Sequence, residues 1–141
     1  MRLWHKDLIP LLPRNQLIGQ WRECCALAKG IAKTGKTNHI LINRIMEYPL
    51  GHFYTYCTLV RNELRRRGYA CNGDALWKWV SGWPERIGIH SIVSIDELFK
   101  GWHNKRYLLQ CYYNLEEKYD CGGISVSEFA PIAMLITGRD G

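Results

Sequence analysis

The apolar residues of the chain recur mainly at helical spacing. The clearest segment is 14–29, in which the apolar positions are Leu17, Ile18, Trp21, Cys24, Cys25 and Ala28. Pro13 suits the first turn of a helix, and Gly30 suits the position just after a helix ends. The pattern therefore predicts a helix over residues 14–29.

Two further segments have the same periodicity. Residues 51–67 carry a stripe of Phe53, Cys57, Val60 and Leu64, and residues 103–119 carry a stripe of Leu108, Cys111, Tyr112, Leu115 and Tyr119. The first of these two ends in arginines, which suit either the helix dipole or contact with DNA. We expect an all-α fold class with three main helices, and a single domain over residues 1–141, because the chain has the length of one domain and no repeats or linker.

The segments between and beyond these helices are harder to assign. Residues 1–12 are predicted to be an extended apolar arm packed against the helices, because Pro10 and Pro13 keep the residues before them away from helical angles. Residues 40–48 fit either a short helix or an irregular apolar segment, and Asp74 begins a possible short helix. Ser94 and Glu97 predict a capping box that starts another. Residues 121–141 fit a short strand or a closing strap.

Residues 29–39 are rich in glycine, lysine and threonine and are predicted to be a mobile basic loop. The run from Gly30 to Thr37 matches the spacing of a phosphate-binding loop. That loop follows a buried strand, whereas a predicted helix precedes this one. Contact between its lysines and DNA phosphates is therefore favoured over nucleotide hydrolysis, which stays an alternative.

Composition narrows the class of protein. The formal net charge is +6, which favours a polyanionic partner. No apolar run is long enough to span a bilayer and the N-terminus is no signal peptide, so we expect a cytoplasmic, nucleoid-associated protein that contacts no membrane. The six cysteines form no C-x-x-C pair. We therefore expect no metal site. The amine chemistry considered next needs no organic cofactor either, so none is expected.

The chemistry centres on the first residue and on Glu23. An α-amino group has a pKa of about 8, well below that of a lysine side chain. The N-terminal amine is therefore the one amine of the chain with a useful neutral fraction at pH 7. Arg2 and Arg22 would lower that pKa further. Such an amine can form a Schiff base with a deoxyribose, and a carboxylate partner can stabilise the developing charge and move protons. Glu23 alone also fits a solvated position paired with Arg22 or a lysine.

Here the sequence resembles the pyrimidine-dimer DNA glycosylases of the phage endonuclease V type. Asn15, Gln16 and Leu17, followed by Trp21, Arg22 and Glu23, match a family pattern of the form QHL…YRE. The resemblance covers residues 1–29 and, more weakly, 51–69. It implies three helices with the N-terminal arm threaded between the first and the third, and a glycosylase that then nicks the backbone as an abasic-site (AP) lyase.

The resemblance also implies residue roles. Glu23 matches the catalytic glutamate, Arg22 an arginine beside the lesion, and His52 a histidine near the abasic sugar. Arg2 matches the arginine that follows the nucleophile, and Asn15 and Gln16 match a polar pair near the kinked strand. We therefore expect Met1, Glu23, Arg22 and His52 to be catalytic, and the DNA-binding residues to be Arg2, Arg14, Asn15, Gln16, Lys29 and Lys33.

Three departures from the family are visible. Phage members begin Met-Thr-Arg and expose the threonine amine, whereas Arg2 here should keep Met1 in place, so the Met1 amine is the expected nucleophile. Ala26 stands where the phage enzyme has a DNA-binding arginine, for which Lys29 could substitute. The aromatic, basic C-terminal end of the family is missing.

The sequence thus predicts a monomeric DNA repair glycosylase and AP lyase that acts on UV-induced pyrimidine dimers or related damaged bases in double-stranded DNA. It should flip a nucleotide and bind mainly through phosphates, with an affinity that falls steeply with salt. The alternative is a non-catalytic basic helical protein that binds nucleic acid or a protein partner.

Overall fold

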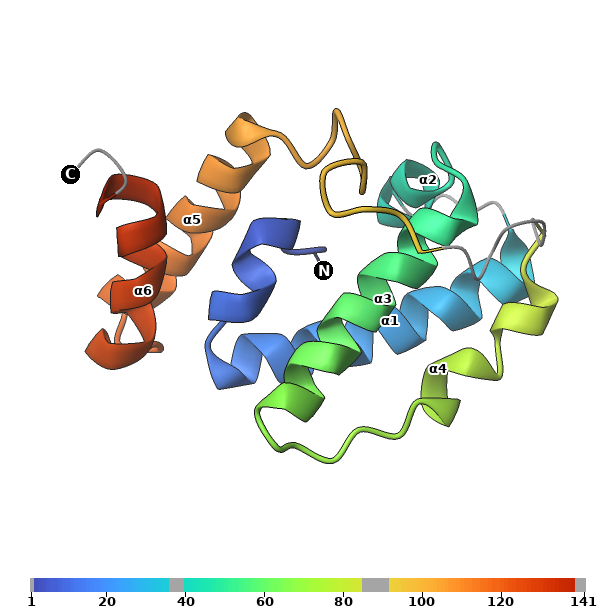
Figure 1. Ribbon diagram of the computed structural model, residues 1–141, viewed down its shortest axis with the longest axis horizontal. Helices are drawn as coiled ribbons and strands as arrows, with labels where there is room; N and C mark the ends of the chain where they lie inside the picture. Colours follow the sequence, from blue (N-terminus) through green and yellow to red (C-terminus); the bar gives the residue numbers. More distant parts are fainter. Residues whose placement is uncertain (1, 36–39, 85–91, 139–141) are drawn as a thin grey trace.

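The computed structural model describes residues 2–35, 40–84 and 92–138, and within these ranges all regular structure is helical, which confirms the all-α prediction (Figure 1). The elements in chain order are η1 (Lys6–Leu11), α1 (Arg14–Thr34), α2 (Ile40–Ile45), α3 (Leu50–Arg66), α4 (Asp74–Trp77), η2 (Val80–Gly82), α5 (Lys105–Asp120) and α6 (Val126–Thr137). The three longest are α1, α3 and α5, as the apolar pattern predicts. None of the described helices is long and apolar enough to cross a membrane.

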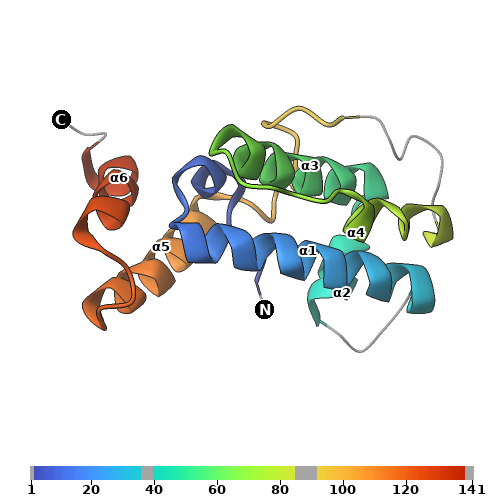
Figure 2. The same cartoon turned by 90° about the horizontal axis from the view of Figure 1, so that it is seen from below.

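Helices α1 and α3 lie against each other, and Figure 2 shows α3 on one side of α1 and the N-terminal end of the chain on the other. The interface is made by the predicted apolar stripes: Leu17, Cys24 and Ala28 of α1, and Phe53, Cys57, Val60 and Leu64 of α3, are all buried. The amphipathic pattern of each helix therefore fixes which face it turns to the other.

Helix α1 is longer than the sequence pattern predicts. It continues through Gly30 to Thr34 and ends at Gly35, whose φ of 64° few other residues adopt. Gly30 therefore does not end the helix. A glycine suits this position because a β-carbon there would lie 2.9 Å from the side chain of Ile42 in α2. The prediction of a loop over 29–39 is thus wrong for residues 29–34, and their helical amides do not form a phosphate-binding loop. Lys36 and Thr37 lie outside the described residues.

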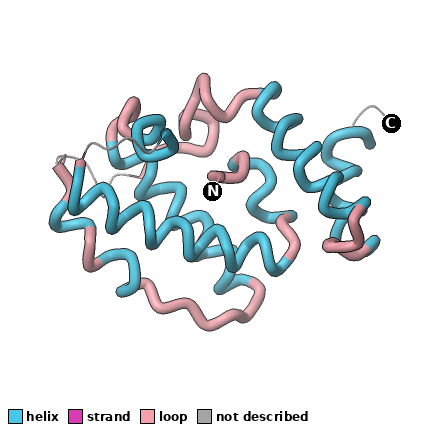
Figure 3. Tube along the Cα trace, turned by 180° about the vertical axis from the view of Figure 1, so that it is seen from behind, coloured by secondary structure: helices cyan, strands magenta, loops and turns pink. Residues whose placement is uncertain are grey.

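The N-terminal arm is only partly extended. Arg2 to His5 are extended, but residues 6–11 form the 3-10 helix η1, so the prediction of an extended segment over 1–12 is wrong in its second half. Short-range capping accounts for this: His5 Nδ1 accepts a hydrogen bond from Asp7 N at 3.0 Å. Figure 3 shows the start of the chain between α1 and α5, as the resemblance implies.

The far end of η1 is held by α3. The Arg67 guanidinium, just after α3, donates to Leu12 O at 2.7 Å and to Pro10 O at 3.1 Å, and its third nitrogen bonds Glu63 Oε2 at 2.7 Å. Arg67 therefore anchors the arm. This role differs from the two considered for the arginines that end this helix, which are interaction with the helix dipole and contact with DNA.

Two predictions near the C-terminal half are wrong. Ser94 and Glu97 do not begin a helix; residues 95–102 form consecutive turns, in which Phe99 has a φ of 49°. Residues 121–141 hold neither a strand nor a strap in their described part, but the helix α6. Its start carries a capping box, since Ser125 Oγ accepts from Glu128 N at 3.2 Å. Helix α6 packs on α5, with the Tyr119 and Phe129 rings stacked at 4.5 Å.

Candidate active site

The carboxylate of Glu23 lies beside the beginning of the chain. Glu23 is half-buried on α1, and the backbone N–H of Arg2 donates to its Oε2 at 3.1 Å. Met1 lies outside the described residues, so the first described nitrogen is the one in contact with Glu23. The expectation that Glu23 and the Met1 amine form one active site stays a prediction.

Gln20, one turn earlier on α1, holds the same stretch of the arm. Its Nε2 donates to Arg2 O at 3.0 Å and lies 3.4 Å from Glu23 Oε2, and its Oε1 accepts from Trp4 N at 2.7 Å. Gln20 is buried, with 1% of its surface exposed. The arm from Arg2 to Trp4 is thus bonded to α1 through one amide and one carboxylate.

Two tyrosines hold the arm from the other helices. The Tyr56 hydroxyl of α3 lies 2.6 Å from Trp4 O and 2.9 Å from Gln20 Oε1, and the Tyr107 hydroxyl of α5 donates to Leu3 O at 2.5 Å. Burial raises the pKa of both phenols, so each stays a neutral hydrogen-bond donor. Helices α1, α3 and α5 therefore all fix the position of the first four residues.

The Arg2 side chain lies between the arm and α5. Its guanidinium is 5.8 Å from the ring centre of Trp4 and interacts with Tyr107 and Cys111. Burial raises the pKa of the Cys111 thiol, with the Arg2 charge opposing this shift. A cation therefore stays close to the contact between Arg2 N and Glu23.

The other expected DNA-binding residues are spread along α1. Arg22 is exposed next to Glu23, and Lys29 and Lys33 follow it by seven and eleven residues, which places all three on one helical stripe. The ammonium groups of Lys29 and Lys33 each lie 5.7 Å from the ring centre of Trp79. Asn15 is exposed and Gln16 half-buried in the first turn of α1.

Arg14 lies at the start of α1. Its guanidinium is 5.4 Å from the Tyr69 ring centre, and its backbone N–H donates to Glu128 of α6 at 3.1 Å. A cavity of about 400 Å³ on this face is lined by Arg14, Trp21, Arg22 and Tyr69, among others. Arg14 and Arg22 therefore share one surface hollow.

His52 lies in the first turn of α3, among aromatic side chains. Its Nδ1 accepts from Phe99 N at 3.0 Å, and its ring lies 5.2 Å from that of Tyr48 and 5.8 Å from that of Phe99. This hydrogen bond holds the turn in which Phe99 has its positive φ. The expectation that His52 is catalytic stays a prediction.

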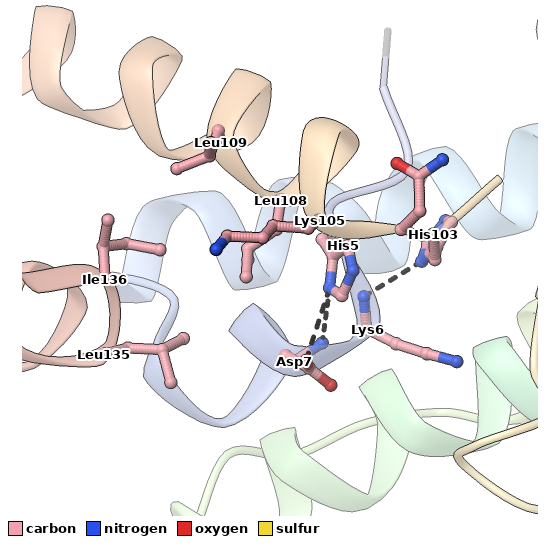
Figure 4. Close-up of a pocket in the computed structure, with 10 residues that line it drawn as sticks. His5, Lys6, Asp7, His103, Lys105, Leu108, Leu109, Leu135 and Ile136 are labelled. Carbon is pink, nitrogen blue, oxygen red and sulfur yellow. Dashed lines mark hydrogen bonds and ion pairs between the residues drawn. The ribbon is translucent and has the colours of Figure 1, made fainter. Parts of the chain in front are cut away.

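A second cavity lies behind the arm. Figure 4 shows this hollow of about 450 Å³, which is lined by residues in or next to η1, α5 and α6, including His5, Lys6, His103 and Leu135. His103 Nδ1 accepts from Lys6 N at 3.0 Å, and the His5 and His103 rings stack at 5.2 Å. Burial, with the nearby His5 and Lys6, lowers the pKa of His103 to about 2. Both histidines thus serve to hold the arm just beyond Trp4.

The described part of the chain contains no group of three or more His, Cys, Asp or Glu side chains placed to hold a metal ion. The described groups around Glu23 are the backbone amide of Arg2, the Gln20 amide and the exposed Arg22 guanidinium. A carboxylate in such a place can stabilise a positive charge or transfer a proton.

Sequence reasoning missed the part that Gln20, Tyr56 and Tyr107 play in holding the arm. Each occupies a position on a predicted helix where its neighbours in the stripe are apolar, and no short motif marks it. The available signal was weak: Gln20 lies on the buried face of α1, where a polar residue needs hydrogen-bond partners.

Comparison with known proteins gives one match. A family model described as pyrimidine dimer DNA glycosylase matches residues 1–76, which include the arm, α1, α2, α3 and the start of α4. No curated protein and no solved structure matches the chain. The matched segment is more than half of the 141 residues and contains Arg2, Gln20, Glu23 and Tyr56. The chain therefore belongs to the pyrimidine dimer DNA glycosylase family.

Proposed function

We propose that the protein is a DNA repair glycosylase and AP lyase that excises UV-induced pyrimidine dimers or related damaged bases. Family membership implies glycosylase activity on a DNA substrate. The observation that carries the finer proposal is the 3.1 Å contact between Arg2 N and Glu23 Oε2, because it brings the first described nitrogen to a carboxylate.

The nucleophile in this proposal is the N-terminal amine of Met1. One residue spans at most about 3.6 Å of chain, so an amine at Met1 lies within one residue's length of the nitrogen that contacts Glu23. The neutral amine attacks C1′ of the damaged nucleotide, the glycosyl bond breaks, and the base leaves with the bonding electrons and takes up a proton. Opening of the sugar ring then gives an imine between the amine and C1′.

Glu23 assists in two steps. Its carboxylate stabilises the positive charge that develops on the sugar as the base leaves. It then removes a proton from C2′, so that the C3′–O bond breaks and the 3′ phosphate leaves by β-elimination. In the described residues Glu23 Oε1 accepts no hydrogen bond, and both bonds to the carboxylate are made at Oε2.

The DNA would be bound through phosphates by the cations around this site. Arg22 is exposed beside Glu23, and Lys29 and Lys33 continue its stripe along α1. The net charge of +6 favours such binding, and nucleotide flipping would give the amine access to C1′.

The test is strand nicking and borohydride trapping on duplex DNA with an abasic site. We expect the native protein to form a covalent adduct with the DNA and to nick it, and Glu23→Gln to nick at least about 100-fold more slowly, the usual effect of losing a proton-transfer group. Glu117→Gln is the matched control, because this exposed glutamate lies on α5 and its side chain makes no hydrogen bond or ion pair within the described residues.

Equal nicking by Glu23→Gln and Glu117→Gln would show that Glu23 has no role in the chemistry. Absence of any adduct with the native protein, together with salt-dependent DNA binding, would instead identify a non-catalytic member of the family. Repeating the assay with duplexes that hold a pyrimidine dimer then measures base excision separately from nicking.

A further inference from the structure

Gln20 is a polar side chain in the core of an otherwise apolar helix face. Its exposed fraction is 1%, and Leu17, Cys24 and Leu27 on the same face are equally buried. A buried amide without hydrogen bonds would cost roughly 1–3 kcal/mol or more. The Gln20 amide therefore needs hydrogen-bond partners within the fold.

Every hydrogen-bonding group of this amide has a partner. The NH₂ group donates to Arg2 O at 3.0 Å and points its second hydrogen toward Glu23 Oε2 at 3.4 Å. The amide oxygen accepts from Trp4 N at 2.7 Å and lies 2.9 Å from the Tyr56 hydroxyl. Gln20 thus binds a carbonyl and an N–H of the arm two residues apart, as a neighbouring β-strand would.

The partners also fix the orientation of the amide. If the oxygen and nitrogen were exchanged, the oxygen would face Arg2 O and the Glu23 carboxylate, and the NH₂ group would face the N–H of Trp4. The two acceptors would then face each other on one side and the two donors on the other, and both pairs would repel. A shift of the arm by one residue would turn the Arg2 carbonyl and the Trp4 N–H away from Gln20. It would also break the bonds of Tyr107 to Leu3 O and of Tyr56 to Trp4 O, so Gln20 and the two tyrosines together hold one register.

We propose that Gln20 is a positioning residue, which fixes the register of the arm so that the N-terminal amine lies against Glu23. This inference rests on the proposed function, since it concerns the placement of that nucleophile. Gln20 acts through Arg2 and Trp4 rather than on the substrate. A displacement of about 1 Å can cost on the order of 100-fold in rate, so the register that Gln20 helps to hold matters for the reaction.

The main variant is Gln20→Met, which keeps the length and much of the volume of the side chain but removes its hydrogen bonds. We expect its trapping rate at saturating abasic-site DNA to fall at least about 10-fold. Affinity for a duplex with a non-reactive abasic analogue should change by less than about twofold, since the cations on α1 are untouched. Hydrogen exchange of the Trp4 amide in the free protein should become faster.

Gln20→Glu supplies a second readout that simple loss of packing would not move. When ionised, the introduced carboxyl group has no hydrogen to donate to Arg2 O, and its charge faces Glu23. When protonated, it donates one hydrogen bond in place of the amide. The trapping rate of Gln20→Glu relative to the native protein should therefore rise as the pH falls from 7 to 5, whereas that of Gln20→Met should not.

The matched control is Asn62→Asp, which makes the same chemical change, amide to carboxyl group, at an exposed position of α3. Its relative rate should be the same at every pH. The positioning role would be overturned if Gln20→Met trapped DNA at the native rate. It would also be overturned if the trapping rate of Gln20→Glu, relative to the native protein, stayed constant between pH 7 and 5.

The outcomes separate this inference from the proposed function. If the native protein forms no adduct, the proposed chemistry fails, but hydrogen exchange still decides the placement of the arm. Faster exchange at Trp4 in Gln20→Met would then uphold the fixed register, and unchanged exchange would overturn it as well.

Discussion

At the scale of single residues, several of the groups that hold the arm are buried and stay neutral. His103 and His5 illustrate this, since burial lowers the pKa of both imidazoles. His103 Nδ1 accepts from Lys6 N at 3.0 Å, a bond that only the neutral imidazole can make. The position of the arm is therefore linked to the protonation of these rings.

This linkage predicts how stability depends on pH. The pKa of His103 is about 2 in the folded protein and 6.5 in the unfolded chain, so the unfolded state binds the additional proton between these values. The stabilisation from neutral His103 is complete above pH 6.5 and is lost as the pH falls, by up to about 1.4 kcal/mol per pH unit.

Urea unfolding at pH 7, 6 and 5 measures this effect. As the pH is lowered, the free energy of unfolding should decrease more steeply in the native protein than in His103→Gln. The glutamine keeps an acceptor for Lys6 N but does not titrate. Equal pH dependence in the two proteins would show that His103 takes up a proton without unfolding.

At the scale of elements, α1 carries the site and also two glycines in its interior. A β-carbon at Gly19 would meet no atom within 4 Å, whereas one at Gly30 would lie 2.9 Å from Ile42 Cδ1. Gly30 therefore allows α2 to approach α1. Gly19 has no such contact, and it lies one turn before Glu23.

Substitution by alanine should separate these two glycines. Gly19→Ala should raise the free energy of unfolding by about 0.5–1 kcal/mol, since alanine loses less backbone entropy in a helix. Gly30→Ala should raise the free energy of unfolding by less, because the new methyl group displaces Ile42. Thermal or urea unfolding of both variants measures the difference, and an equal gain in the two would contradict the close packing of α2 on Gly30.

The elements also show what sequence patterns can and cannot predict. Helices α1, α3 and α5 were predictable because their apolar stripes are regular over several turns. The end of α1 was not, since Gly30 looks like a terminator unless its contact with Ile42 is known. The start of α6 could have been predicted, because Ser125 and Glu128 form the same type of capping box that was assigned to Ser94 and Glu97.

At the scale of the whole molecule, the site depends on contacts between distant parts of the chain. Glu23 could be singled out from the residues around it, but the partners of the arm are Gln20 in α1, Tyr56 in α3 and Tyr107 in α5. Their separations from the arm range from 16 to 104 residues. No local pattern predicts such contacts, so three of the residues that shape the site could be found only in the folded structure.

The same arrangement gives the family resemblance a physical basis. The arm and α1 carry the most specific motif, and together they form the contact between Arg2 N and Glu23. Helix α5, which lies beyond the matched segment, adds the bond from Tyr107 to Leu3 O. The second half of the chain thus supports a site whose proposed chemistry lies in the first half.

The central claim is that the N-terminal amine is the nucleophile, and mapping the trapped adduct tests it most directly. The protein is incubated with abasic-site duplex and borohydride, digested, and the DNA-linked peptide is identified by mass spectrometry. We predict that the sugar is attached to the α-amine of Met1, and that a short N-terminal extension abolishes the adduct. Attachment to a lysine side chain, or an undiminished adduct in the extended protein, would contradict the account.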